Sequence, residues 1–333
     1  MELLYKIKNI DCKYFKAKKS VLKINNLNIY KGEIVFMIGA SGVGKSTVLE
    51  TLGLMNNTLV TSNTSEFTFS VDNCTEDFTK IWTKKESYLA SIRKKYLSFI
   101  FQNTNLFETL NIADNGLITL LLQGNTERSA KRKVLPLFKE IFTNDEFKEI
   151  FTFNELNAIF TRNELEQTFS KKEIETLLVE SKSNSKERGI GEMSGGQRQR
   201  LAFVRAIAGN YSVLFADEPT GNLDWGNANN LMSKLIADIK QKESTAIIVS
   251  HDIALSVKHA TKIILIDKES EIVNDKKHSY GVISKSNTFS KCTNNSWESN
   301  DSNSLDFSEE SLIKYLKEKI ANNDTTASIL KSK

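Results

Sequence analysis

The stretch MSGGQRQRLAFVRAIAGNYSVLFADEPTGNLD, residues 193–224, decides the fold of this chain. It begins with a glycine-rich turn, Ser194 to Gln197, that opens a helix with apolar periodicity, and such a turn offers backbone N–H groups and a helix dipole to an anion. The apolar run 212–216 follows and is typical of a buried strand. It ends in two adjacent carboxylates, Asp217 and Glu218. An anion-binding turn followed by paired acids indicates phosphate and metal chemistry.

A second glycine-rich turn lies nearer the N-terminus and fits the phosphate-binding pattern G-x-x-x-x-G-K-[ST] at every required position. It follows the apolar run 34–38 and precedes a helical stretch, 47–54. Its glycines let the backbone curl around a phosphate, Lys45 can neutralise phosphate oxygens, and the Ser46 hydroxyl can complete a Mg²⁺ shell. The residues of this phosphate loop are Gly39, Ala40, Ser41, Gly42, Val43, Gly44, Lys45, Ser46 and Thr47.

Several apolar runs stop at a polar residue that can act on a nucleotide. These ends are Ile38 before Gly39, Phe101 before Gln102, Ala216 before Asp217, and Val249 before Ser250 and His251, with a fifth run ending at Asp267. Helical patterns separate the runs, which favours crossover connections and a parallel sheet. Ligands of open parallel α/β sheets bind outside the carboxyl ends of the strands, so we expect these polar residues to converge on one site. Residues 3–10 and 20–30 alternate apolar and polar positions, the pattern of antiparallel strands.

Composition excludes several classes of protein. With 333 residues, 40% hydrophobic and 26% charged, the chain is of ordinary globular type. No apolar run approaches membrane-spanning length, and the N-terminus lacks the features of a secretion signal. Three scattered cysteines, Cys12, Cys74 and Cys292, favour a reducing compartment over a disulfide framework. A net charge of +4 is mild and is read as a solvated surface.

In these motifs the chain resembles the nucleotide-binding subunit of ATP-binding cassette (ABC) transporters. The phosphate loop is common to many NTPases, whereas the turn at Ser194 to Gln197 matches the family signature L-S-G-G-Q with Met193 in the Leu position. The order of motifs also agrees: phosphate loop, Gln102, signature, acidic strand end, and then His251.

Two longer strings narrow the resemblance. Residues 216–224 (ADEPTGNLD) and 99–106 (FIFQNTNL) look most like the lipoprotein-release and macrolide-export branch. The likeness covers about residues 1–122 and 188–273. It implies an α/β fold: a P-loop NTPase three-layer core around a parallel sheet, with an antiparallel β subdomain and an enlarged α-helical subdomain.

The predicted domain boundaries follow from this likeness and from where it fades. Residues 1–275 would form the ABC-type ATP-binding domain, with the helical subdomain at about 103–200 and a repeat-containing insert at about 124–187. Residues 276–333 would form a polar linker, rich in Ser and Asn, and a C-terminal amphipathic helix that lies on the domain or docks elsewhere.

The resemblance implies roles for residues around the ATP bound by this chain. Tyr14 or Phe15 would stack on adenine, and the basic residues around them leave the choice open. Lys45 and Ser46 would hold phosphates and Mg²⁺, and Asp217 would bind Mg²⁺ through water.

Three further residues would serve the hydrolysis itself. Gln102 would contact Mg²⁺ and the attacking water, on a loop that faces a transmembrane partner. Glu218 would act as the general base that polarises this water. His251 would bind the γ-phosphate.

The signature turn would instead serve the ATP held by a second copy. Ser194, Gly195, Gly196 and Gln197 would close on the γ-phosphate of the other subunit, and Asp224 would link the two sites. ATP would therefore hold two cassettes together head to tail, as a homodimer or cassette pair, and hydrolysis would release them.

The insert contains an internal repeat of four helix-capping boxes spaced nine residues apart. They are Thr143 to Glu146, Thr152 to Glu155, Thr161 to Glu164 and Ser170 to Glu173. Nine residues are two and a half helical turns, so short helices, each started by its own Thr or Ser, fit better than one straight helix. A partner-binding surface and a solvated appendage without a dedicated role are equally compatible with this repeat.

The sequence therefore predicts an ATP hydrolase, the cytoplasmic subunit of an ABC transporter or mechanotransmission complex. It would associate with the inner face of the membrane through a separate transmembrane permease. The alternatives are a soluble non-transport ABC ATPase acting on nucleic acid or ribosomes, and a regulatory protein that binds ATP without turnover. No long heptad arm, zinc-cysteine set or second cassette is visible, so direct nucleic-acid contact is not expected. Glu218 and His251 argue against the regulatory protein.

Overall fold

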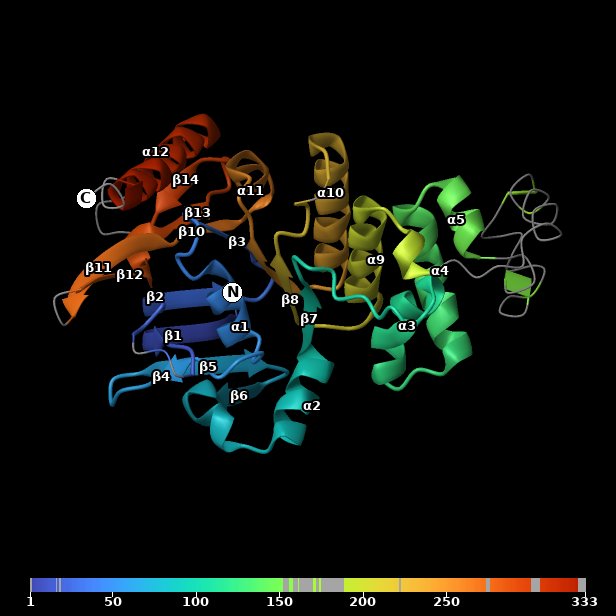
Figure 1. Cartoon of the computed structure of the whole chain (residues 1–333), viewed down its shortest axis with the longest axis horizontal. Helices are drawn as coiled ribbons and strands as arrows, with labels where there is room; N and C mark the ends of the chain where they lie inside the picture. The colour runs from blue at the N-terminus through green and yellow to red at the C-terminus, as the bar shows by residue number, and fades with distance from the viewer. Residues whose placement is uncertain are drawn as a thin grey trace. The chain divides into compact units, whose positions relative to one another are not determined.

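The computed structural model describes residues 2–15, 17, 19–151, 156–157, 161, 170–171, 174, 189–221, 223–273, 276–300 and 306–328. The chain divides into two compact units. Unit 1 comprises Met1–Leu97, Tyr211–Glu218 and Met232–Lys333, and unit 2 comprises Ser98–Asn210 and Pro219–Leu231. Figure 1 labels the helices and strands of both units.

A parallel sheet forms the core of unit 1. Its four strands run in the order β10-β3-β9-β8, and each neighbouring pair is parallel. They are β3 (Ile34–Ile38), β8 (Val213–Asp217), β9 (Thr245–Val249) and β10 (Lys262–Leu265). Every residue of β3, β9 and β10 is buried, which explains why these strands read as uninterrupted apolar runs. Helix α1 (Lys45–Leu52) contacts β8 and β9, and α11 (Ile253–His259) contacts β3.

A mainly antiparallel sheet forms the second part of unit 1. Its strands are β11 (Asp267–Val273), β12 (Lys276–Ile283), β2 (Leu22–Tyr30), β1 (Leu3–Cys12), β5 (Glu66–Val71) and β6 (Cys74–Asp77), in that spatial order, with β4 (Leu59–Val60) paired to β1. The antiparallel pair predicted at 3–10 and 20–30 is confirmed as β1 and β2.

Strands β5 and β6 lie in a part of the chain that is rich in polar residues. Phe67, Phe69 and Val71 alternate with polar residues and turn one face inward. There Phe69 stacks on Tyr5 with ring centroids 4.8 Å apart, and Phe78 packs edge-on to Phe67 at 5.2 Å. A 3₁₀ helix (Phe78–Thr83) and α2 (Glu86–Tyr96) follow.

The C-terminal region corrects one prediction, because residues 276–300 are not a linker. Strand β12 pairs parallel with β2, and β13 (Thr288–Lys291) extends the core sheet by pairing antiparallel with β10. A short 3₁₀ helix at Lys285–Asn287 precedes β13. Strands β14 (Trp297–Ser299) and β15 (Asp306–Phe307) continue the sheet beyond β13. Although this segment is rich in Ser and Asn, it contains two aromatic residues, Phe289 and Trp297, whose side chains are buried.

The predicted C-terminal helix is confirmed as α12 (Glu309–Ser328). Within unit 1 it packs against α11 (Figure 1). Leu312 and Leu316, which share the predicted apolar face, are fully buried.

Helices dominate unit 2. Among its described residues are α3 (Ile112–Leu122), α4 (Glu127–Ile141), α5 (Asn144–Ile150) and α9 (Gly195–Ala208), with a 3₁₀ turn at Ile190–Glu192. Helices α3 and α4 both pack on α9. Gly116 allows α3 and α4 to approach closely, since a Cβ at this position would lie only 2.5 Å from the Phe138 ring. Strand β7 (Leu97–Ile100) and helix α10 (Trp225–Gln241) run from one unit into the other.

The first predicted capping box of the insert is confirmed. Thr143 Oγ1 accepts the Glu146 N–H, and the Glu146 carboxylate accepts the Thr143 N–H, at the start of α5. The boxes at Thr152 and Thr161 fall outside the described residues, apart from Thr161 itself. Of the fourth, the structure describes an N–H of Ile174 that donates to the Ser170 carbonyl at 3.0 Å, which is one helical turn. Among the described residues, no helix is both long enough and apolar enough to cross a membrane.

Candidate functional site

The phosphate loop connects β3 to α1 in unit 1. Gly42 and Gly44 adopt positive φ angles of +75° and +93°, which the turn requires and other residues rarely adopt. A Cβ on Gly39 would lie 2.8 Å from the Ile266 carbonyl oxygen. Lys45 is buried, and its Nζ donates to the carbonyls of Gly39 and Ala40 at 3.0 Å each. The loop thus curls around its own lysine, as a cradle for phosphate oxygens does.

The acids at the end of β8 lie against this loop. Ser46 Oγ–H donates to Asp217 Oδ2 at 2.8 Å. Burial raises the pKa of Asp217 and the charge of Glu218 acts in the same direction, while the Ser46 hydrogen bond and the Lys45 charge oppose them. Two hard oxygen ligands from different elements therefore converge, and they are of the kind that Mg²⁺ prefers.

Glu218 and His251 form the next layer of the site. His251 follows β9, and its Nε2 lies 2.6 Å from Glu218 Oε1. Glu218 itself has a φ of +48°, a left-handed conformation rare for a residue with a Cβ. Its N–H donates to the Val249 carbonyl at 3.0 Å, which holds the strained residue in place. The predicted convergence of polar residues at the carboxyl ends of β3, β8 and β9 is thus observed within unit 1.

The two candidate adenine-stacking residues differ in their surroundings. The Tyr14 hydroxyl donates to Glu50 Oε2 at 2.8 Å and lies 3.0 Å from Thr47 Oγ1, so its phenol is tied to α1. Burial, with the Glu50 hydrogen bond, raises the pKa of Tyr14 to about 12. Phe15 is 88% exposed.

Gln102 belongs to unit 2, where it is exposed at the end of β7. Two buried residues that the sequence analysis did not select hold the loop after it. Asn115 of α3 donates from Nδ2 to the carbonyls of Phe107, Leu110 and Asn111 at 3.0–3.2 Å. Arg205 of α9 donates to the carbonyls of Asn105 and Thr104, both at 2.7 Å. The sequence signal for both residues is that each is a polar side chain within a largely apolar helical segment, α3 for Asn115 and α9 for Arg205.

The signature turn also belongs to unit 2 and opens α9 as predicted. Ser194 Oγ accepts the Gln197 N–H at 3.2 Å, while Gln197 Oε1 accepts the Ser194 N–H at 2.9 Å, a reciprocal capping box. Met193, which precedes the turn, is buried, whereas Ser194 and Gly195 are exposed. Because an α-helix leaves its first N–H groups unpaired, the start of α9 can accept an anion.

Asp224 precedes α10 in the same unit and caps it. Its Oδ1 accepts the Asn227 N–H at 3.0 Å and its Oδ2 accepts the Asn227 side-chain amide at 2.5 Å. The hydrogen bond from the Asn227 N–H has the largest effect and that from the Asn227 side chain the next largest, and both lower the pKa of Asp224. Trp225 beside it is 61% exposed.

A phosphate loop between β3 and α1, with an acid-tipped neighbouring strand in a parallel sheet, defines a P-loop NTPase. Known proteins narrow this class. The family described as ABC transporter matches residues 22–221. This chain belongs to the ABC transporter family, and within it to the ATP-binding subunits, which are ATP hydrolases.

Named relatives agree with the branch that the sequence suggested. The bacitracin export ATP-binding protein BceA of Halalkalibacterium halodurans is 31% identical over 77% of this chain and 80% of its own length. The lipoprotein-releasing system ATP-binding protein LolD of Wigglesworthia glossinidia brevipalpis is 28% identical over 82% of this chain and 96% of its own length. The macrolide export ATP-binding/permease protein MacB of Neisseria gonorrhoeae is 29% identical over 82% of this chain but only 34% of its own length.

A solved structure shares the fold. The dimeric structure of MJ0796, a bacterial ABC transporter cassette, is 25% identical and covers 79% of this chain and 94% of that one, with a TM-score of 0.56.

Proposed function

We propose that this chain binds ATP with Mg²⁺, hydrolyses it as one half of a cassette pair, and so drives a separate transmembrane permease. The observation that carries this proposal is a pair of contacts made by the adjacent acids that end β8: Asp217 accepts from Ser46 of the phosphate loop, and Glu218 contacts His251. The relatives named for bacitracin export and lipoprotein release support transport over the alternative of an ATPase acting on nucleic acid or ribosomes.

The donor set fits a magnesium ion. Ser46 Oγ would be a direct ligand, and Asp217 would hold the ion through a water molecule, with Gln102 as a further predicted contact. The bound ion would neutralise charge on the phosphates. When ATP binds, the Lys45 ammonium would move its hydrogen bonds from the carbonyls of Gly39 and Ala40 to the phosphate oxygens.

Glu218 is suited to act as the general base. Its carboxylate lies beside the loop, and its backbone is held in a strained, left-handed conformation. His251 orients this carboxylate and would contact the γ-phosphate. A water molecule between Glu218 and the phosphate would lose its proton to the carboxylate as it attacks.

Pairing of two chains explains the second anion site. The exposed start of α9 lies in unit 2, and Lys45 holds the chain's own phosphates in unit 1. Ser194 to Gln197 would therefore close on ATP held by a second copy, and exposed Trp225 beside Asp224 supplies apolar surface for the pair. The pair would associate with the inner face of the cell membrane through its permease.

Substituting Glu218→Gln tests this function, because the amide keeps the shape of the side chain and cannot accept the proton. We expect turnover to fall by about 100-fold or more, while ATP binding and ATP-dependent pairing survive. The measurements are phosphate release and sedimentation of the purified chain with and without Mg²⁺-ATP.

The matched control is Glu310→Gln, which removes an exposed acid from α12 of unit 1 and has no predicted role at the nucleotide. It should retain native turnover. If Glu218→Gln hydrolysed ATP as fast as the native chain, Glu218 would not be the base.

A further inference from the structure

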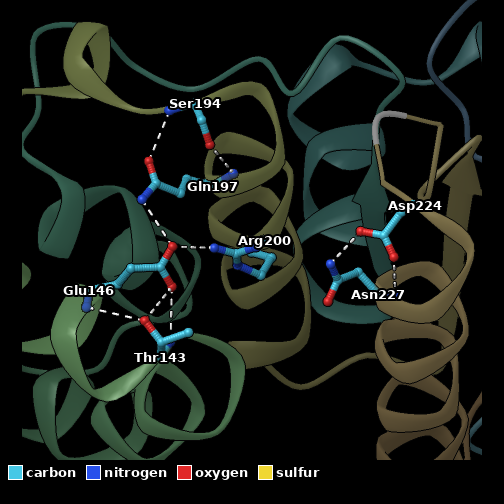
Figure 2. Close-up of polar contacts among 7 residues, drawn as sticks. All are labelled: Thr143, Glu146, Ser194, Gln197, Arg200, Asp224 and Asn227. Atoms are coloured by element: carbon cyan, nitrogen blue, oxygen red, sulfur yellow. Dashed lines mark hydrogen bonds and ion pairs between the residues drawn. The ribbon is translucent and has the colours of Figure 1, made fainter.

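The first helix of the insert is joined to the signature turn by one carboxylate. Glu146 lies in the first turn of α5, and Figure 2 shows it between Thr143 on one side and Gln197 and Arg200 of α9 on the other. Its side chain is 18% exposed, so this junction is largely shielded from water. Glu146 is separated from Gln197 by 51 positions and from Arg200 by 54.

The two carboxylate oxygens serve different helices. Oε2 accepts from the Thr143 N–H at 2.9 Å and from Thr143 Oγ1 at 3.1 Å, which completes the capping box of α5. Oε1 accepts from Gln197 Nε2 at 2.9 Å and from the Arg200 guanidinium. Glu146 therefore fixes the start of its own helix and contacts the start of α9 with the same group.

Gln197 passes this contact to the turn itself. While its Nε2 donates to Glu146, its Oε1 accepts the Ser194 N–H at 2.9 Å. An amide whose two ends are both bonded has one orientation, because a flip would place oxygen against oxygen and N–H against N–H. A chain of two hydrogen bonds thus links Glu146 through Gln197 to the Ser194 N–H.

Electrostatics keep this link ionised. Burial acts to raise the pKa of Glu146, but the Thr143 N–H, the Gln197 amide and the Arg200 charge together hold it below its usual range. Arg200 is itself positioned, with its guanidinium 5.3 Å from the centre of the Phe142 ring. Charge-assisted hydrogen bonds of this kind are among the stronger ones in proteins.

We propose that Glu146 is a positioning residue that sets the signature turn for closure on the ATP of the second copy. The proposal rests on the proposed pairing of cassettes. It gives the insert a mechanical role, since a displacement of α5, for example by a partner protein bound to the insert, changes the hydrogen bonds that orient Gln197 and Ser194. Glu146 does not touch nucleotide and acts only through Gln197 and Arg200.

Glu146→Gln is the discriminating variant, because glutamine also completes a capping box and so preserves the start of α5. It removes the charge that meets Arg200 and places an amide where Gln197 needs an acceptor. We test it in the Glu218→Gln background and measure ATP-dependent dimerisation by sedimentation. The dimer dissociation constant should rise about tenfold, as expected for loss of one coupled contact.

A separate readout excludes a merely structural role. Binding of a fluorescent ATP analogue to the monomer should stay within about twofold of the parent value, because Lys45 belongs to unit 1. Two control variants share α5. Glu149→Gln removes an exposed charge from the same helix and should leave dimerisation unchanged. Thr143→Ala weakens the cap and should lower the melting temperature without raising the dimer dissociation constant.

The outcomes are distinct. Dimerisation of Glu146→Gln equal to that of the parent would overturn the positioning role and leave the proposed function standing. Equal weakening in Thr143→Ala and Glu146→Gln would show that only the stability of α5 matters, and would also overturn it. If the Glu218→Gln parent bound ATP but never dimerised, the proposed pairing would fail and this inference would fall with it.

Discussion

Glu218 combines two features at the residue scale that a folded protein normally avoids. Its positive φ costs about 1–3 kcal/mol for a residue with a side chain. Its carboxylate also lies next to that of Asp217, whose pKa is raised chiefly by burial. A segment selected for stability alone would have neither feature, so their coincidence beside the phosphate loop marks the place where chemistry outweighs stability.

Tyr14 and Phe15 allow a prediction at the same scale. Tyr14 is committed to Glu50 and Thr47, and Phe15 is exposed, so we expect Phe15 to stack on adenine. Phe15→Ala should weaken ATP binding by about 1–3 kcal/mol, the usual value of a base–aromatic contact. Tyr14→Phe should leave ATP affinity nearly unchanged and lower the free energy of unfolding by about 1 kcal/mol.

Calorimetric titration with ATP and with inorganic triphosphate measures this difference. Triphosphate carries no base, so its affinity should not change in Phe15→Ala. A larger loss of ATP affinity in Tyr14→Phe than in Phe15→Ala would reverse the assignment.

Helix α9 connects several functional segments at the scale of elements. Its first turn is the signature, Arg200 meets Glu146, and Arg205 near its end holds the loop that follows Gln102. Because a helix is stiff over this length, we expect a movement of that loop to reach the signature turn within unit 2.

Arg205→Gln tests this connection. Arg205 is 8% exposed, and its loss leaves the carbonyls of Thr104 and Asn105 without their donors. We expect the free energy of unfolding to fall by about 2–3 kcal/mol, as for buried charged hydrogen bonds. Urea unfolding measures this change, with exposed Arg128→Gln on α4 as the control, which should stay within about 0.5 kcal/mol of the native chain. Equal stability of the two variants would contradict the role of Arg205.

Some elements could be predicted from the sequence and others could not, for physical reasons. Strands β3, β8, β9 and β10 are buried on both faces and therefore leave unbroken apolar runs. Strands β13 and β14 were predicted as linker because this segment contains few apolar residues. In the structure β13 pairs with β10, which is distant along the chain, and with the short strand β14. The hairpin of β5 and β6 was visible as alternation at Phe67 and Phe69, but the polar residues around it dominated the composition.

For the molecule as a whole, the predicted site residues fall into two groups. Unit 1 brings together the phosphate loop, Asp217, Glu218 and His251, whereas Gln102, the signature turn and Asp224 belong to unit 2. Under the proposed function, hydrolysis by a cassette pair would use the first group from one copy and the signature turn from the other.

A mixing experiment tests this division of labour. Lys45→Ala disables the phosphate loop of one chain, and Ser194→Arg disables the signature turn of another, so each variant alone should be inactive. In an equimolar mixture, half of the dimers are mixed and each has one intact composite site, which predicts roughly a quarter of native turnover.

The control is a mixture in which a single chain carries both substitutions and is paired with native chain. There the intact loop always faces a damaged turn in mixed dimers, so those dimers should add no activity. Failure of the Lys45→Ala and Ser194→Arg mixture to recover activity would place both functions on one chain.

The sequence by itself determined the phosphate loop, the buried parallel strands, the acids at their ends, the signature turn and the first capping box of the insert. Each depends on neighbouring residues: glycines that permit a turn, apolar runs that require burial, or a cap three residues from its partner. Only the tertiary structure decided that Glu146 meets Gln197 and Arg200, that Arg205 holds the loop after Gln102, and that residues 276–300 complete two sheets. These contacts join residues far apart in the chain, and no local pattern of side chains specifies which distant partner packing will supply.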